Sequence, residues 1–303
     1  MNQIHTLAEK LNVKFCITVT NDIVADQRLN RTALSLIRNG YSVSVIGRRR
    51  KTRVDLSLFP YRIKLFNLIF NRGPLFYAEY NIRLFFYLLF MQTDVFVACD
   101  LDTLPANYMV ARIRRKTIIY DSHEYFTEVP ELVGRHTTKK IWEWIEKKTL
   151  PHLRHAYTVS QSIADAYHRK YGLKMEVIHN YPLKRKLSEN NKVQLRTNNE
   201  NIIIYQGSVN MGRGLEIAIL SMKFLENSRL VIIGDGDIKE DLIKLTLDAG
   251  LTDKVTFTGR VSLNDLYKFT AQADLGISLE EDLGLNYRYA LPNKLFDYIS
   301  AGI

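Results

Sequence analysis

The sequence predicts an α/β protein made of two Rossmann-like domains that face a cleft. Residues 14–47 read as a strand, a helix and a second strand, an order that requires a parallel sheet with a right-handed crossover. Residues 184–200 are polar, charged and Asn-rich, with little apolar periodicity, and predict a linker. The same strand-loop-helix order restarts directly afterwards. We therefore expect one domain over residues 1–183 and a second over residues 201–303.

The composition is that of a soluble globular protein. Hydrophobic residues make up 46% of the 303 residues and charged residues 24%, which excludes a disordered chain. No apolar run reaches the ~18 residues that a bilayer crossing needs, and the first ten residues lack the features of a signal peptide. Cys16 and Cys99 lie in apolar, strand-like runs, so we expect buried, reduced thiols and a cytoplasmic protein.

The positive charge is concentrated in the first part of the chain. Residues 1–190 hold 30 Lys/Arg and 17 Asp/Glu, a net charge of +13, whereas residues 191–303 hold 12 and 15, a net charge of −3. This asymmetry predicts an anionic partner for the first domain. The basic clusters at 48–53 and 112–116 carry no nucleic-acid-binding signature, so nucleic acid is not expected. Solvated loops and an anionic membrane surface remain as the two interpretations.

Polar residues follow the strands predicted for the first domain. A β-rich run at 14–20 leads through a loop into a helix, and a strand follows at 41–47. No G-x-G-x-x-G motif follows the first strand, so the dinucleotide fingerprint is absent. Ligands of parallel sheets bind beyond the carboxyl ends of the strands, although a solvated helix start with a local Asp–Arg pair is the alternative. The residues that this rule directs to the cleft are Asp22, Arg28 and, after a strand at 94–100, Asp102.

Residues 59–91 are aromatic, apolar and basic. The run at 84–91 is too short to cross a membrane and predicts a core helix. Aromatic stripes usually pack in cores, which favours interior packing for the whole region. The alternative is an interfacial segment that holds its apolar side chains among lipid headgroups, with its cations outside.

His123 is the main catalytic candidate. It follows a predicted strand at 116–121, in a polar loop, with Asp121 and Glu124 as neighbours. An imidazole in such a loop can donate a hydrogen bond or interact with developing charge, although a lone His is more often structural. Either neighbouring carboxylate can orient the ring or act as a base, and the sequence does not choose between them. The predicted elements that complete this domain are helices at 139–148 and 161–170, a strand at 155–160 and a closing segment at 175–182.

The second domain begins with a glycine-bearing loop after a strand at 201–207. Glycines let backbone amides approach an anion closely, and Arg213 can form bidentate hydrogen bonds with phosphate oxygens. Further strands are predicted at 228–233, 254–261 and 273–279, and the last of these leads into an acidic loop. The residues that stand at these strand exits are Gly207, Gly212, Arg213, Gly214, Gly234, Arg260 and Val261.

A short helix closes the chain. Pro292 suits the first turn of a helix, apolar residues recur from position 295, and Gly302 ends the pattern. Asn293 and Lys294 stand at its amino end, where free amides and the helix dipole attract anions. Asp297 lies one turn further on, within reach of a sugar hydroxyl. An ordinary capped surface helix is the alternative.

Two of these segments resemble the retaining glycosyltransferases of family 4, which have the two-domain GT-B fold. They are Tyr-Asp-Ser-His-Glu-Tyr-Phe-Thr-Glu-Val-Pro-Glu-Leu at 120–132 and Leu-Pro-Asn-Lys-Leu-Phe-Asp-Tyr-Ile-Ser-Ala-Gly-Ile at 291–303. The resemblance implies that Lys294 and Arg213 neutralise the leaving diphosphate and that Asp297 holds the ribose. It places His123 beside the transferred sugar, and the strand exit with Arg260 and Val261 beside the base. It also places Gly207, Gly212, Gly214 and Gly234 on the donor-binding side. Asp22, Arg28 and Asp102 then lie on the acceptor side.

The sequence departs from this family in three places. Ser208 stands where the family carries an Arg, and Arg213 replaces its Lys. The family commonly carries two Glu residues in this region, and the aligned positions of this chain hold Tyr289 and Asp297, so the pair is absent. A subset of the family has a Pro-Ser/Asn-Lys motif in place of the pair, and this chain fits that subset. The candidates for a stabilising carboxylate are then Glu280, Glu281 and Asp282, whose alternative is a solvated acidic loop. The chain also ends at Ile303, where the family continues into a buried strand, so we expect a C-terminally truncated second domain.

These features together predict a glycosyltransferase. We expect transfer of a sugar from a nucleotide-diphosphate sugar, with retention, to a glycan or lipid-linked acceptor in cell-surface glycan synthesis. No Asp-x-Asp pair stands on the donor side, since Asp100 and Asp102 suit the acceptor side, so we expect no cofactor and no metal requirement. A peripheral place at the inner membrane face fits the basic first domain. The alternatives are a nucleotide-sugar epimerase and a non-catalytic, truncated nucleotide-sugar-binding module.

Overall fold

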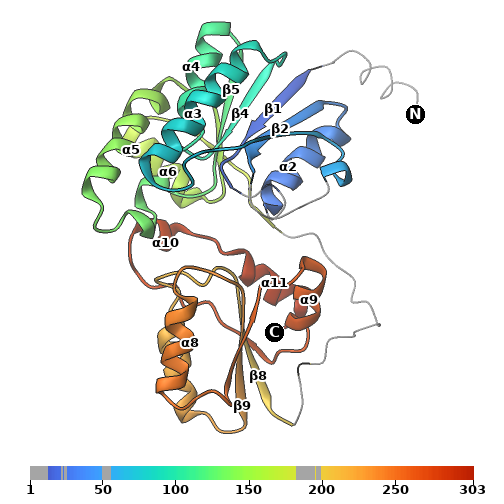
Figure 1. Cartoon of the computed structure of the whole chain (residues 1–303), viewed down its shortest axis with the longest axis vertical. Coiled ribbons are helices and arrows are strands. Elements are labelled where there is room, and N and C mark those ends of the chain that lie inside the picture. Colours follow the sequence, from blue (N-terminus) through green and yellow to red (C-terminus); the bar gives the residue numbers. More distant parts are fainter. Residues whose placement is uncertain (1–12, 22, 24–25, 50–55, 182–194, 196–198) are drawn as a thin grey trace. The chain divides into compact units, whose positions relative to one another are not determined.

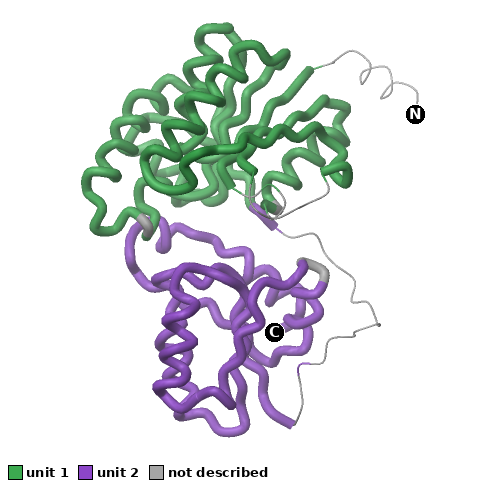
Figure 2. Tube along the Cα trace, viewed as in Figure 1, with its two compact units in different colours: residues 1–179 green, residues 180–303 purple. Residues whose placement is uncertain are grey.

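The computed structural model describes residues 13–21, 23, 26–49, 56–181, 195 and 199–303. The chain forms two compact units, residues 1–179 and residues 180–303 (Figure 2). The boundary between the units lies four residues before the end expected for the first domain. Each unit is a parallel sheet with helices packed against it (Figure 1), which confirms the predicted α/β class with two Rossmann-like domains.

Unit 1 contains a seven-stranded sheet in the order β3-β2-β1-β4-β5-β6-β7, and every neighbouring pair is parallel. The order reverses between β1 and β4, which creates a topological switch point where α/β sheets bind ligands. The strands are β1 (Lys14–Thr18), β2 (Ser42–Arg48), β3 (Arg62–Phe66), β4 (Val95–Cys99), β5 (Thr117–Ser122), β6 (His155–Thr158) and β7 (Glu176–Val177).

Helices cover both faces of this sheet because alternate residues of its buried strands point to opposite sides. On β1, Cys16 packs in one apolar cluster with α3 and α4, whereas Ile17 packs in another with α2. Asp26 caps α2 by accepting hydrogen bonds from two backbone N–H groups of its first turn. The helices are α2 (Gln27–Arg38), α3 (Gly73–Phe90), α4 (Leu104–Arg114), α5 (His136–Thr149) and α6 (Gln161–Tyr171), with 3₁₀ turns η1 (Leu56–Leu58), η2 (Phe126–Glu128), η3 (Pro130–Leu132) and η4 (Leu150–His152).

The region 59–91 differs most from the prediction. Its basic and aromatic first half contains the edge strand β3, and the helix begins at Gly73 rather than near position 84. β3 alternates polar and apolar residues over only five positions, a short signal that the dense aromatic pattern obscured. One face of α3 is buried through residues at helical spacing, as expected for a core helix. The opposite face exposes Ile82, Phe86 and Phe90.

Unit 2 contains a four-stranded parallel sheet in the order β10-β9-β8-β11. Its switch point lies between β8 and β11, because β9 and β10 extend the sheet on the other side of β8. The strands are β8 (Asn201–Gln206), β9 (Ser228–Ile233), β10 (Val255–Gly259) and β11 (Leu275–Gly276). The helices are α7 (Leu215–Ser221), α8 (Lys239–Asp248), α9 (Leu263–Thr270), α10 (Leu285–Tyr289) and α11 (Asn293–Ala301), and η5 (Met222–Phe224) follows α7.

One residue of the predicted linker belongs to the core of unit 2. Leu195 is buried in an apolar cluster with Ile202, and its backbone N–H donates to Oε1 of Gln272 at 3.0 Å. The polar composition around Leu195 gave no sign of this contact. The rest of the predicted linker, apart from residues 199 and 200, lies outside the described residues.

Two expectations about the chain as a whole can be compared with the structure. Cys16 and Cys99 are both buried and unpaired, as predicted. None of the helices formed by the described residues combines the length and the apolar character that a bilayer crossing requires.

Candidate functional site

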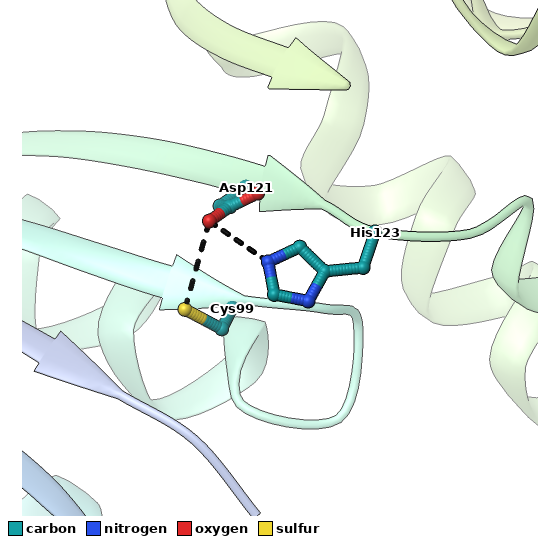
Figure 3. Close-up of side chains that lie close together, drawn as sticks. All are labelled: Cys99, Asp121 and His123. Atoms are coloured by element: carbon teal, nitrogen blue, oxygen red, sulfur yellow. Dashed lines mark hydrogen bonds and ion pairs between the residues drawn. The ribbon is translucent and has the colours of Figure 1, made fainter. Parts of the chain in front are cut away.

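In unit 1 a buried polar cluster surrounds His123, at the carboxyl ends of β4 and β5 (Figure 3). Nε2 of the His123 ring lies 2.9 Å from Oδ2 of Asp121, the fifth residue of β5. Nδ1 lies 3.6 Å from Oδ2 of Asp100, and the backbone N–H of His123 donates to Oδ1 of the same carboxylate at 2.8 Å. The hydroxyl of Tyr157 on β6 donates to Oδ2 of Asp121 at 2.6 Å. Two carboxylates therefore hold the imidazole, one at each nitrogen.

Asp100 adopts a left-handed backbone conformation directly after β4, with φ at 60°. Asp tolerates this region better than most residues, because its short side chain can bond locally. The turn lets the backbone N–H of Asp100 reach the carbonyl oxygen of Asp121 at 2.8 Å, while its carboxylate reaches the loop after β5. The turn thus ties the ends of two neighbouring strands together under His123.

Burial and charge set the protonation of this cluster. Burial lowers the pKa of His123, but Asp121 and Asp100 outweigh it and raise that pKa to about 9. The ring is therefore an imidazolium at neutral pH. Burial raises the pKa of Asp100, and burial together with the charge of Asp100 raises the pKa of Asp102 to about 7. A carboxyl group with a pKa raised as far as that of Asp102 is typical of functional clefts.

The second carboxylate beside His123 is Asp100, and the sequence suggested Glu124 as one of two candidates for this place. Glu124 is exposed, and its backbone carbonyl accepts a hydrogen bond from Ser122 Oγ at 2.8 Å. Sequence neighbours in an extended loop point in different directions, whereas residues at the ends of adjacent strands converge. The position of Asp100 at the end of β4 was the signal that could have identified it.

Cys99 brings a thiol to the same cluster. Its Sγ, the carboxylate of Asp121 and a ring nitrogen of His123 lie within 4.8 Å of one another, a spacing that a metal ion could bridge. Burial and the charge of Asp121 raise the pKa of this thiol well above its usual value, so it stays protonated. Its Sγ lies 3.8 Å from the same oxygen that Tyr157 and His123 approach. This donor set fits a hydrogen-bonded network, and we assign no metal to it.

The acceptor-side residues lie partly at the switch point of unit 1. Thr20, which follows β1, donates its hydroxyl to Oδ2 of Asp102, which follows β4. Asp102 is buried, and its Oδ1 has no hydrogen-bond partner among the described residues. Arg28 lies near enough to Asp100 and His123 to shift the pKa of both, and its side-chain Nε and Nη1 are buried without a partner in the part of the chain that the structure describes. Asp22 lies outside the described residues.

In unit 2 a second cluster lies at the switch point between β8 and β11. Nζ of Lys294, in the first turn of α11, donates to Oε1 of Glu280 at 2.6 Å. Nη1 of Arg213 reaches the same oxygen at 3.4 Å, and Ser278 Oγ donates to Oε2 at 2.7 Å. The sequence predicted both cations, but it did not predict that one carboxylate holds them. Glu280 is only 13% exposed, so the solvated-loop interpretation is wrong for this residue.

Aromatic rings and burial complete the surroundings of the two cations. Nζ of Lys294 lies 4.3 Å from the ring centroid of Tyr205, and the guanidinium of Arg213 lies 4.8 Å from that of Tyr287. Burial lowers the pKa of Lys294, and the bond to Glu280 offsets part of this effect. Burial raises the pKa of Glu280, but hydrogen bonds from Lys294 and Ser278 outweigh it and leave that pKa below its usual value. The pair is ionised at neutral pH.

Two glycines of this region pack directly against neighbouring backbone, and a third packs against side chains. Gly234 has φ at 151°, and a Cβ there would lie 1.8 Å from the carbonyl oxygen of Gly207. Gly214, which caps α7 with φ at 65°, would place a Cβ 2.4 Å from the carbonyl oxygen of Leu279. Gly212 also has positive φ, and a Cβ there would meet Leu283 at 2.4 Å. Packing thus accounts for three of the four predicted glycines. At Gly207 the backbone conformation is the reason, since φ is 140° and a Cβ there would meet no atom closer than 3.6 Å.

The remaining donor-side residues lie at different distances from this centre. Asn293 accepts a hydrogen bond from the side chain of Asn180 at 2.9 Å through its Oδ1. Oδ2 of Asp297 accepts from Nε2 of Gln206 at 2.8 Å, so its carboxylate is tied to the end of β8. Arg260 is exposed and lies 4.0 Å from Asp235, and Val261 packs against an apolar cluster of unit 2. Asn293 and Asp297 share the amino-terminal half of α11 with Lys294, whereas Arg260 and Val261 follow β10.

Comparisons with known proteins agree with this architecture. Residues 27–181, just over half of the chain, match the family model described as Glycosyltransferase Family 4, and residues 187–286 match the model described as Glycosyl transferases group 1. The structure of HepE from Anabaena in complex with UDP aligns with a TM-score of 0.68 at 15% identity, over 96% of this chain and 79% of that one. A further HepE structure holds UDP-glucose.

Two curated proteins are related in sequence. The α-D-kanosaminyltransferase of Streptomyces kanamyceticus is 25% identical over 196 residues, which are 59% of this chain and 51% of that protein. An uncharacterised glycosyltransferase of Methanocaldococcus jannaschii, MJ1607, is 35% identical over 91 residues, 28% of this chain and 23% of that protein. The matched part thus spans about half or less of each relative's length. The two family models and the fold nevertheless agree, and the chain belongs to glycosyltransferase family 4 and has the GT-B fold.

Proposed function

We propose that the protein is a glycosyltransferase whose unit 2 binds the diphosphate of a nucleotide-sugar donor. The observation that carries this proposal is the convergence of Lys294 and Arg213 on one carboxylate oxygen of Glu280. Two cations and one carboxylate leave a net positive charge in a largely buried place. Such a site is electrostatically complementary to a diphosphate, because a low-dielectric surrounding strengthens each contact to an anion.

The same cations suit the chemistry of sugar transfer. As the glycosidic bond to the donor breaks, negative charge accumulates on the leaving diphosphate, and preorganised cations stabilise that charge. Glu280 keeps Lys294 and Arg213 in place before the donor arrives. The presence of UDP or UDP-glucose in structures of HepE supports a nucleotide sugar as the donor. Because both cations come from the protein, we propose that no metal ion is required.

Unit 1 supplies the residues for the sugar and the acceptor in this proposal. The Nδ1–H of the His123 imidazolium lies 3.6 Å from Asp100, beyond hydrogen-bond distance, so it can donate to a sugar hydroxyl, while Asp100 and Asp121 maintain the charge of the ring. The unpartnered oxygen of Asp102 and the buried nitrogens of Arg28 offer hydrogen bonds to an acceptor at the switch point. We propose a glycan or lipid-linked acceptor and transfer with retention of configuration, which product analysis by NMR tests directly.

The exposed face of α3 supports a peripheral place at an anionic membrane. Ile82, Phe86 and Phe90 are each more than half exposed, and with Lys64 and Arg83 they line a hollow of about 740 Å³. Apolar side chains beside cations are typical of interfacial segments. Replacing Phe86 and Phe90 by Ser should reduce co-sedimentation with anionic vesicles, and unchanged sedimentation would contradict this role.

Titration calorimetry with UDP and GDP, in the presence of a chelator, tests the donor site. Lys294→Met should weaken binding of the preferred nucleotide about 10- to 100-fold, because a hydrogen bond to a charged group contributes about 1.5–3 kcal/mol. Arg213→Gln should act in the same direction. Lys268→Met is the matched control, since Lys268 pairs with Asp265 on α9 and takes no part in the cluster. Equal affinities in all four proteins, or a strict need for metal, would contradict the proposal.

A further inference from the structure

A positively charged hollow lies on unit 1, away from the cluster around His123. It has a volume of about 590 Å³ and is bounded by the end of α4, the start of β5, the turn η4 and the start of β6. His123 and Asp121 follow or end β5, whereas this hollow includes Thr117 at the amino end of the same strand. The two sites therefore lie at opposite edges of one sheet.

Basic side chains dominate the wall of this hollow. Of the ten described residues that line it, six are Lys, Arg or His and none is Asp or Glu. The six are Arg112, Arg115, Lys116, His152, Arg154 and His155. All six are exposed. Side chains of this number and kind around one hollow repel one another unless an anion compensates them.

The chain itself provides little of that compensation. Lys116 forms an ion pair with Asp94 at 2.8 Å. Arg112 donates to the hydroxyl of Tyr108 at 3.0 Å, which satisfies a donor but adds no negative charge. Among the described residues, no carboxylate lies within ion-pair distance of Arg112, Arg115 or Arg154.

The backbone at Arg115 adds a second, independent observation. This residue caps α4 in the left-handed conformation, with φ at 54°, a position that Gly or Asn normally occupies. Its N–H reaches the carbonyl oxygen of Arg112, and the N–H of Lys116 reaches that of Ala111. The cationic side chain of Arg115 thus lines a basic hollow from a strained backbone position, although Asn would end the helix there with less strain.

We infer that this hollow binds a phosphate group. Guanidinium groups match the geometry of phosphate oxygens, and Arg112, Arg115 and Arg154 offer three of them. His152 and Tyr108 have stacked rings, with centroids 6.5 Å apart, which gives one wall a flat surface. The phosphate can belong to a soluble phosphate ester or diphosphate, or to a phospholipid headgroup. Exposed Ile113, in the last turn of α4, is placed to enter a lipid layer in the second case.

The test uses the full chain with Lys294→Met and Arg213→Gln as background, so that the proposed donor site contributes little. Phe86→Ser and Phe90→Ser are added to every protein in the vesicle assay, so that the exposed face of α3 contributes little there. Calorimetry with inorganic phosphate and pyrophosphate reports the soluble source. Co-sedimentation with phosphatidylcholine vesicles, with and without phosphatidic acid, reports the lipid source. The test variant combines Arg115→Asn, which suits the left-handed backbone, with Arg154→Gln. The matched control combines Arg38→Gln with Arg169→Gln, which removes two exposed cations from α2 and α6.

The background chain and the control should bind pyrophosphate or the acidic vesicles, and the test variant should bind at least about tenfold more weakly. Calorimetric binding without vesicle binding would identify the soluble source, and vesicle binding alone the lipid source. Fluorescence of buried Trp142 reports whether unit 1 remains folded in every variant. The inference is overturned if the background chain binds neither ligand, or if test and control variants bind equally well.

Discussion

Asp102 allows a direct test of how much a buried carboxylate in unit 1 lowers the stability of the protein. Its pKa is raised from 3.8 to about 7, first by burial and then by the charge of Asp100. The folded protein therefore keeps the proton to a higher pH than the unfolded chain. Stability falls as the pH rises from about 4 to about 7, because the folded state binds more protons over that interval. Three pKa units correspond to about 4 kcal/mol of unfolding free energy.

Asp102→Asn removes the free-energy cost of ionising this buried group, and it leaves an oxygen that can accept the hydrogen bond from the Thr20 hydroxyl. We expect the variant to match the wild type at about pH 4 and to exceed its unfolding free energy by up to about 4 kcal/mol at about pH 8. Activity should fall despite the gain in stability, since functional groups are often retained at a cost to stability.

Urea unfolding at a series of pH values measures this effect. The only two tryptophans of the chain, Trp142 and Trp144, lie in unit 1, so their fluorescence reports the unfolding of that unit. Asp94→Asn is the matched control, because hydrogen bonds from Lys116 and from the backbone of Lys14 lower the pKa of Asp94. That control should lose stability above about pH 4, by less than about 1 kcal/mol, since the side chain is exposed. An unchanged pH profile in Asp102→Asn would refute the reasoning.

Three further predictions concern single positions. Gly234→Ala should destabilise unit 2 by more than about 3 kcal/mol, because the new Cβ would lie 1.8 Å from the carbonyl oxygen of Gly207. Gly250→Ala is the control and should cost about 1 kcal/mol, because no atom lies within 4 Å of its Cβ position. Thermal melts followed by circular dichroism compare the two variants. Glu146→Leu should lower the unfolding free energy of unit 1 by about 2–4 kcal/mol in urea unfolding, because the hydroxyls of buried Thr127, buried Tyr167 and half-buried Tyr171 lose their acceptor, and Glu146→Gln should cost less. His123→Gln should lower the unfolding free energy of unit 1 by about 3 kcal/mol below pH 6.5. This loss should shrink as the pH rises through about 9, where the wild-type ring releases its proton. A loss that does not depend on pH would contradict the assignment of a charged His123 ring.

Local sequence patterns predicted most of the strands and helices that build the two sheets. The runs at 14–20, 94–100 and 116–121 are short and apolar with polar exits, and each appears as a central strand. β3 was missed because an edge strand of five residues gives a weak signal. The α/β order and the linker composition sufficed for two domains, since few other arrangements satisfy both.

The sequence predicted the position of a candidate residue where that residue follows a strand or opens a helix. His123 and Asp102 follow strands and Lys294 opens a helix, because strand ends and helix starts are visible in the sequence. The partners of these residues were not predictable, since contacts such as Glu280 with Lys294 depend on which strands become neighbours. Arg213 and Lys294 were identified as separate anion contacts, whereas in the structure both bond to one oxygen of Glu280.

A crystal structure of the protein with the nucleotide diphosphate that it binds most tightly tests the donor-site assignment most directly. The account predicts phosphate oxygens within hydrogen-bond distance of Nζ of Lys294 and of the Arg213 guanidinium, in crystals grown without divalent metal. It also predicts that Glu280 keeps at least one of these contacts. Phosphates bound elsewhere, with the bond of 2.6 Å between Lys294 and Glu280 unchanged, would contradict it.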